Sequence, residues 1–261
     1  MPLSKEYTEH TVFKKINAMI GFYEDLSFLI FRFITTGTSS AINIDSYVYS
    51  SIQGTLESIR LILANGRIND SYTLLRKYYD SCIINIYSNL YLEDNCNLNN
   101  FIVTKIDNWL KGKEQLPKYR EMSQYVRNST KLSTINLLLH KDNRYKEIRG
   151  RCNDNTHYNY YYNILLNDNK IYLENRIKVL STFSYDIEQI FILHLAYLFY
   201  LNQHYMASTD YADSMDLGQE PQKGSQYFVA PFIQKIFNDF IKSKRIDIAE
   251  AIKSQTDMFL E

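Results

Sequence analysis

Apolar residues recur at three- and four-residue intervals along most of this chain, which is the spacing of amphipathic α-helices. In the first half, the pattern predicts long helices over 11–34, 42–64 and about 69–92, then shorter ones over 101–110, 134–140 and 143–149. In the second half, it predicts helices over 158–166, 171–180, 187–205, 231–241 and 246–259. No segment shows sustained alternation of apolar and polar residues, so the expected fold class is all-α.

Turn-forming residues suggest how these helices are connected. Asn65 and Gly66 end one predicted helix and the next begins within a few residues, which predicts an antiparallel helix pair. The longest expected loop is 207–226, with Gly218, Pro221 and Gly224. We predict a single helical domain over 1–261, with a bundle core over about 41–206, extra N-terminal helices and a C-terminal helical extension over about 226–261.

The composition is that of a folded protein, with 45% hydrophobic and 22% charged residues. Lys plus Arg is 29 and Asp plus Glu is 29, so any contact with nucleic acid depends on a local basic patch, or on one doubled by dimerisation. The 23 tyrosines suit either an A/T-rich coding sequence or a functional tyrosine surface, and the first is favoured.

Cysteine usage and hydropathy indicate the compartment. Cys82, Cys96 and Cys152 form no CxxC pair, which favours a reduced, cytoplasmic protein. The first ten residues are polar and lack the apolar stretch of a secretory signal. The most apolar run, 190–201, contains His194 and is too short to span a bilayer, so we expect a buried helix, a hydrogen-bonded histidine and no membrane contact.

The segment 151–157 carries the most distinctive chemistry, because it places an arginine and a histidine six positions apart across small polar residues. We expect Arg151 to close one helix, Asp154 or Asn155 to cap the next, and His157 to lie in its first turn facing the arginine. A phosphate at such a helix start would meet backbone N–H groups, a guanidinium and an imidazole able to move a proton. Upstream, positive charge is added by Arg144, Lys146 and Arg149. The alternative is structural: Arg151 pairs with Asp154, and His157 is a surface residue.

In this segment the chain resembles the HEPN superfamily, helical domains of prokaryotic toxins and phage-defence ribonucleases, whose signature places an arginine, a polar residue and a histidine between two helices. Arg151 and His157 match the two named positions, whereas Cys152 stands where the family usually has Asn, Asp or His. Asn153 or Asp154 would then take over the polar role. The resemblance covers 145–166 and extends more loosely to 55–92.

The resemblance implies a metal-independent endoribonuclease without a cofactor, acting in phage defence or in a toxin–antitoxin stress response. It implies attack of the ribose 2′-hydroxyl to leave a 2′,3′-cyclic phosphate, with His157 as acid and base, Arg151 as the cation at the transition state, and Asn153 or Asp154 as orienting partner. It also implies a homodimer, and an antitoxin or defence protein as a further partner.

Other candidate residues surround this segment. Arg76 and Asp80 lie one helical turn apart, which predicts an ion pair or a supporting contribution to the arginine–histidine site. Arg149, Lys146 and Tyr158 are candidate RNA contacts, and tyrosines 158 and 160–162 include rings able to stack on bases. The histidines 194 and 204 have no metal-ligand spacing, so no metal site is expected. The competing function is a non-catalytic helical module of the same architecture that binds a protein or nucleic-acid partner.

Overall fold

The computed structural model describes residues 3–33, 44–97 and 102–261. The expected all-α class is confirmed, because the described residues form helices and isolated β-bridges but no strand. The helices are α1 (Lys5–Thr8), α2 (Val12–Phe33), α3 (Ile44–Ala64), α4 (Ile68–Asn95), α5 (Thr104–Leu110), α6 (Tyr119–Asn128), α7 (Ser133–Leu139), α8 (Arg144–Thr156), α9 (Tyr161–Leu165), α10 (Arg176–Leu201), α11 (Asp210–Asp216), α12 (Pro231–Ile236), which continues into a π-helical turn (Phe237–Lys242), and α13 (Ile246–Gln255).

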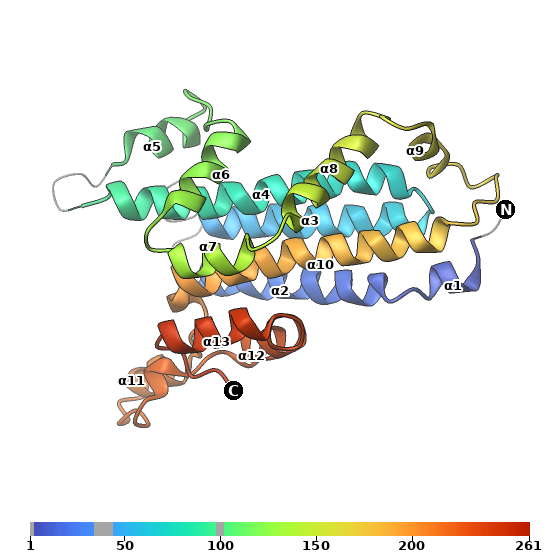
Figure 1. Ribbon diagram of the computed structural model, residues 1–261. Coiled ribbons are helices and arrows are strands. Elements are labelled where there is room, and N and C mark those ends of the chain that lie inside the picture. Colours follow the sequence, from blue (N-terminus) through green and yellow to red (C-terminus); the bar gives the residue numbers. More distant parts are fainter. Residues whose placement is uncertain (1–2, 34–43, 98–101) are drawn as a thin grey trace.

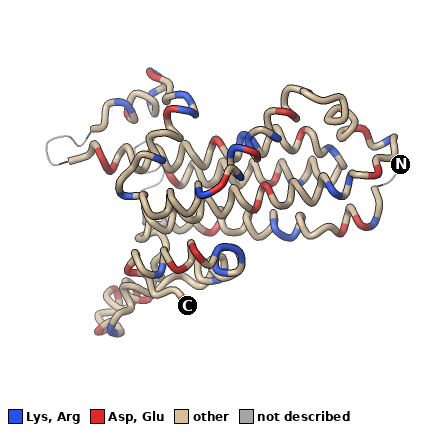
Figure 2. Tube along the Cα trace, in the orientation of Figure 1, with Lys and Arg blue, Asp and Glu red and all other residues tan. Residues whose placement is uncertain are grey.

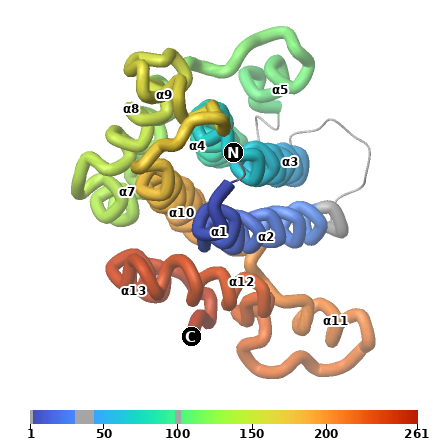
Figure 3. The backbone as a smooth tube through the Cα atoms, turned by 90° about the vertical axis from the view of Figure 1, so that its right-hand side faces the viewer, coloured from blue at the N-terminus to red at the C-terminus, as the bar shows by residue number. Residues whose placement is uncertain are grey.

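Four long helices form the centre of the molecule. Helix α2 packs against α3, α3 against α4, α4 against α10, and α10 again against α2, so the four close into a bundle. Figure 1 shows them running side by side along the length of the molecule, and Figure 3 shows the bundle from one end. The predicted antiparallel pair is α3 and α4, joined at Gly66, whose φ of 75° a glycine adopts without strain.

Two further layers cover the bundle. Helices α6 and α8 pack on α4, while α7 and α8 contact α10. On another side, α12 packs against α2, and α13 against α7 and α10 (Figure 1). Apolar residues of the bundle and of both layers join one buried cluster, so the C-terminal helices share the core of the bundle. Among the described residues, no helix combines the length and the apolar character needed to cross a membrane.

Tyrosine supplies much of this core. Eight of the twelve largest fully buried side chains are tyrosines, namely Tyr7, Tyr23, Tyr49, Tyr72, Tyr78, Tyr79, Tyr145 and Tyr197. A buried tyrosine fills the interior with its ring and needs a partner for its hydroxyl. The abundance of tyrosine is therefore in good part structural, whatever the coding bias behind it.

The predicted buried histidine is confirmed and stands at the centre of a polar chain. The His194 Nδ1 atom accepts from Tyr23 Oη at 2.7 Å, and Nε2 donates to Asn85 Oδ1 at 2.9 Å. Asn85 Nδ2 in turn donates to Asp45 at 2.6 Å, which fixes the amide orientation and with it the histidine tautomer. Burial lowers the pKa of His194 to about 3, so the ring is neutral. This chain links α2, α10, α4 and α3.

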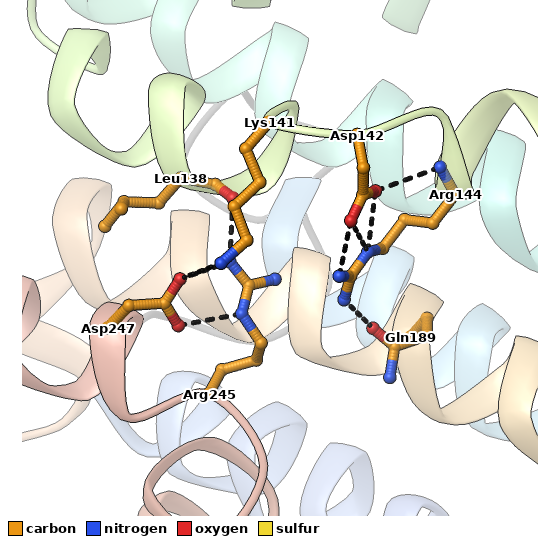
Figure 4. A network of polar contacts seen from close by, with 7 residues as sticks. All are labelled: Leu138, Lys141, Asp142, Arg144, Gln189, Arg245 and Asp247. Atoms are coloured by element: carbon orange, nitrogen blue, oxygen red, sulfur yellow. Dashed lines mark hydrogen bonds and ion pairs between the residues drawn. The ribbon is translucent and has the colours of Figure 1, made fainter.

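A second polar network fixes the start of α8 and the C-terminal layer (Figure 4). The Arg144 guanidinium binds Asp142 and donates to Gln189 on α10 at 2.8 Å. At the start of α13, the buried Arg245 binds Asp247 and donates to the Leu138 carbonyl at 2.7 Å. These contacts tie the start of α8 to α10, and the end of α7 to the start of α13.

Several predicted elements differ from those observed. The helix expected to end at 149 continues to Thr156, and the helices expected over 171–180 and 187–205 are one helix, α10. The expected loop 207–226 contains the short helix α11, and α6 lies where no helix was expected. Residue 34 of the first predicted helix, residues 42 and 43 of the second, and residue 101 of the fourth lie outside the described residues.

Candidate functional site

The expected break between Arg151 and His157 is absent. Arg151 lies inside α8, and His157 is the C-cap residue that ends the same helix. The short polar residues before the cap bond back to their own helix: Asn155 Nδ2 donates to the Arg151 carbonyl at 2.9 Å, and Thr156 Oγ1 to the Cys152 carbonyl at 2.8 Å. Asn155 and Cys152 are also buried, and that burial outweighs the low helix propensity of the segment.

One continuous helix places the two candidate catalytic side chains on different faces. Six residues of α-helix separate them by about 9 Å along the axis and turn them about 120° apart around it. Arg151 binds a carboxylate of α10, whereas the His157 side chain is exposed to solvent. Within the described residues no hydrogen bond joins the two side chains. The expected geometry, in which Arg151 closes one helix and His157 lies in the first turn of the next, is therefore wrong.

Arg151 instead forms a bidentate ion pair with Asp186. Its Nε donates to Asp186 Oδ2 at 2.8 Å and its Nη2 to Oδ1 at 2.6 Å, while Tyr72 Oη donates to Oδ2 at 3.3 Å. The Asp186 side chain is fully buried, and a third of the arginine side chain is exposed. The hydrogen bonds to Asp186 raise the pKa of Arg151 above its usual value. The alternative pairing with Asp154 is also wrong.

Asp186 is the residue that sequence reasoning missed. It lies 35 positions after Arg151, and nothing in the local pattern around either residue connects them. One signal was present: Asp186 immediately precedes a long apolar helical stretch, where a carboxylate has to be buried and so requires a cation. That signal indicates that a partner exists without indicating which one.

The expected ion pair between Arg76 and Asp80 is likewise replaced by a longer-range one. Asp80 Oδ1 accepts from Arg149 Nη1 at 2.5 Å, so the carboxylate joins α4 to α8. The Arg149 guanidinium also lies over the ring of Tyr119 on α6, 3.3 Å from its centroid. Arg149, a candidate RNA contact, is thus held between a carboxylate and an aromatic ring. Arg76 makes neither a hydrogen bond nor an ion pair with any described residue.

Contacts between α4 and α8 show where Arg76 points. Thr73 on α4 lies 3.3 Å from Thr156 between their hydroxyls, and Asp80 on α4 binds Arg149, so the two helices run antiparallel. Arg76 lies on α4 between Thr73 and Asp80, at helical intervals that put all three on the face toward α8. Its charge also lowers the pKa of Cys152 on α8, although burial raises that pKa overall, to about 12.

None of the other predicted site residues forms a hydrogen bond with the His157 ring in the part of the chain that the structure describes. Asp154 Oδ1 accepts from Asn159 Nδ2 at 2.7 Å, so Asp154 does not cap a following helix. The Asn153 side-chain oxygen is buried without a hydrogen-bond partner. Tyr158 is half exposed, with a φ of 50°, and Lys146 is exposed.

Helices α6 and α8 both pack on α4, and each of these three helices carries arginines. Arg120 and Arg127 on α6 and Arg149 on α8 line one hollow, and Arg76 lies on the face of α4 toward α8. We call these four residues the arginine face. Arg120 and Arg127 are exposed and make no hydrogen bond or ion pair within the part of the chain that the structure describes. Figure 2 shows acidic and basic residues mixed along the described chain, whose sequence has a formal net charge of zero. Sequence analysis did not find the α6 arginines because it predicted no helix there.

Neither a metal centre nor a relative identifies the site. Over residues 3–33, 44–97 and 102–261, no group of three or more His, Cys, Asp or Glu side chains is placed to hold a metal ion. Comparison of the chain with protein-family models, with curated proteins and with solved structures finds no match.

Proposed function

We propose that this chain is a helical module that binds RNA, and that the arginine face holds the phosphate backbone. The observation that carries this proposal is that three guanidinium groups of the arginine face have no acceptor in the fold. Arg76, Arg120 and Arg127 have no hydrogen-bond or ion-pair partner among the described residues. A guanidinium without a carboxylate offers its full fork of donors to a phosphate, and phosphate neutralisation supplies most of the affinity of sequence-independent binding.

Most of the other described arginines have a partner, although the exposed Arg67 makes no side-chain hydrogen bond or ion pair among the described residues either. Four of them, Arg144, Arg151, Arg176 and Arg245, each bind carboxylates or carbonyl and amide oxygens of the fold. Arginines that hold parts of the fold together therefore have hydrogen-bond acceptors for their guanidinium groups. With no net charge to provide a general attraction, a cluster of unpaired cations is the feature most suited to a polyanion.

Exposed aromatic rings follow the end of α8. Tyr158 is 49% exposed, Tyr160 63% and Tyr161 74%. Aromatic faces of this kind stack on unpaired bases irrespective of sequence. The combination of guanidinium groups and open rings favours single-stranded RNA over duplex, because only unpaired bases reach the rings.

A metal-independent endoribonuclease of HEPN type is the second candidate, and one observation favours it. The His157 ring is exposed and has no hydrogen-bond partner among the described residues, so both of its nitrogen atoms are accessible to a bound RNA. Arg151 is held by Asp186 and does not face it, so a second chain in a homodimer would have to complete such a site.

Fluorescence anisotropy with a labelled single-stranded RNA tests the binding proposal. We expect affinity to fall steeply with NaCl concentration, and Arg76→Gln, Arg120→Gln and Arg127→Gln each to weaken binding and to lower the salt slope by about one. Arg60→Gln is the control, because Arg60 is an exposed arginine on α3, whereas α6 and α8 pack on α4. Binding that is absent, or equal in all four variants, would overturn the proposal.

The same RNA, incubated in EDTA and examined on a denaturing gel, separates the two candidates. An RNA that is bound but stays intact supports the binding module. Cleavage by the wild type that disappears in His157→Ala would replace it with the ribonuclease.

A further inference from the structure

A hollow of about 480 Å³ lies within the arginine face, between α6 and α8. The residues that line it are Tyr119, Arg120, Ser123, Gln124, Arg127, Asn128 and Arg149. Three of the seven are arginines, and none carries a carboxylate. We propose that this hollow is a binding site for a terminal phosphate, the phosphate monoester at the 5′ end of an RNA strand. The inference rests on the proposed function, since it names the part of the RNA that this face holds.

The sequence of α6 places several hydrogen-bond donors on the side of the helix that lines the hollow. Arg120, Ser123, Gln124 and Arg127 follow one another at intervals of three, one and three residues, which is a single stripe of an α-helix. The neighbouring side of α6, with Met122 and Val126, is buried in the core, and Ser123 is buried at the border between the two sides. The orientation of the helix is therefore fixed by its apolar side, and the two arginines are held two turns apart along one wall of the hollow.

Arg149 forms the opposite wall with its guanidinium already oriented. The guanidinium lies over the ring of Tyr119, and its Nη1 donates a hydrogen bond to Asp80, so Nε and Nη2 remain available. An arginine fixed in this way loses less conformational freedom when it binds an anion than a free one does. The remaining lining residues, a hydroxyl and two side-chain amides, are able to donate to phosphate oxygens as well.

The charge of the hollow distinguishes a monoester from the diesters of the RNA backbone. Three guanidinium groups, of which one is neutralised by Asp80 from outside the hollow, leave two positive charges. A phosphodiester carries one negative charge, whereas a phosphate monoester carries roughly 1.5–2 near neutral pH. The hollow is also larger than a phosphate needs, and its volume lies in the range of small-ligand sites, which leaves room for the attached nucleoside.

Two RNAs of identical sequence, one with a 5′-phosphate and one with a 5′-hydroxyl, test this site in anisotropy competition. We expect the wild type to prefer the phosphorylated strand by about tenfold, the effect of one or two charge-assisted contacts. Arg120→Gln/Arg127→Gln should abolish that preference, and Arg120→Lys/Arg127→Lys should keep part of it. Arg76→Gln, outside the hollow, should weaken both strands equally. Equal binding of the two strands by the wild type, or a preference that survives in the double Gln variant, would overturn the inference.

Adenosine 5′-monophosphate and adenosine make the test independent of RNA binding. In ligand-detected NMR we expect the nucleotide to bind the wild type, adenosine to show no binding, and the double Gln variant to bind neither. If no RNA binds but this pattern is found, the site stands and the RNA-binding proposal fails. If RNA binds but the nucleotide does not, the proposal of RNA binding stands and the site is refuted. Far-UV circular dichroism of each variant shows that it is folded.

Discussion

Arg151 and Asp186 hold α8 against α10 through two hydrogen bonds, and this pair determines what the arginine contributes. The carboxylate has no exposed surface, so it depends on the guanidinium for its charge balance. Arg151 cannot turn toward a substrate without leaving that charge buried and unpaired. Arg151, which the sequence suggested as a catalytic arginine, therefore has a structural role in holding α8 against α10.

Removal of the cation should destabilise the fold. Arg151→Met leaves the Asp186 carboxylate buried without a partner, and we expect a loss of about 2–3 kcal/mol in the free energy of unfolding. The value lies below that for a fully buried pair because a third of the arginine side chain reaches solvent. Urea denaturation at pH 7 measures it. The double variant Arg151→Met/Asp186→Leu, which removes both charges, should recover part of the loss, and a single variant as stable as the wild type would contradict the assignment.

The sequence predicts the bundle better than the layers around it. Periodicity located α2, α3 and α4 within a few residues, and Gly66 marked the turn between two of them, because long amphipathic helices carry their pattern locally. Helix α8 shows the limit of that approach. Its last turn consists of Asn, Asp and Thr residues, which favour caps and turns. This turn is helical because Cys152 and Asn155 are buried where α8 packs on α4.

The site shows the same limit. The arginine and the histidine were visible as candidates, but their partners were not, since Arg151 binds a residue on α10 and Arg149 binds residues on α4 and α6. These pairings depend on which helices become neighbours. Local spacing suggested Arg76 for Asp80, and tertiary packing supplied Arg149 instead.

The buried Asp45 should not tolerate conversion to an amide. Its carboxylate accepts from Asn85 at 2.6 Å, Asn89 at 2.8 Å and Tyr205 at 2.9 Å. Asp45→Asn would turn an NH₂ group toward these donors, so we expect a loss of about 2–3 kcal/mol from unmade bonds. Thermal and urea unfolding should show it. Asp25→Asn on the exposed side of α2 serves as control, and an Asp45→Asn variant as stable as this control would refute the argument.

The buried His194 and the partly buried His140 should make the protein less stable in mild acid. Burial lowers the pKa of His194 to about 3 and, with help from the nearby Arg127 charge, that of His140 to about 4. In the unfolded chain each titrates near 6.5, so below that pH the unfolded state binds protons that the folded state does not. The stability that neutral histidines provide at pH 7 is therefore lost progressively as pH falls from about 6.5 toward 4.

The expected loss by pH 4 is about 3 kcal/mol for His194 and less for His140, because solvent screens its partly exposed ring. Urea denaturation from pH 7 to 4.5 measures most of this loss while avoiding the main range of the carboxylates. His140→Gln should flatten this dependence, because it removes one titrating group. Its side chain can still bond to Tyr197, whose hydroxyl lies 3.3 Å from His140 Nε2. An unchanged slope in this variant would show that His140 does not contribute.

Two glycines should respond to alanine in opposite directions. At Gly66, φ is 75°, and an added Cβ would lie within 3 Å of side-chain atoms of Asn169 and Leu3, so Gly66→Ala should destabilise the fold by more than about 1 kcal/mol. At Gly150, inside α8, a Cβ would meet nothing within 4 Å, and Gly150→Ala should stabilise it by roughly 0.5–1 kcal/mol. Thermal unfolding of the two variants measured together tests both statements. A stabilised Gly66→Ala variant would contradict the left-handed backbone conformation at the turn between α3 and α4. A destabilised Gly150→Ala variant would contradict a continuous α8 with open space beside residue 150.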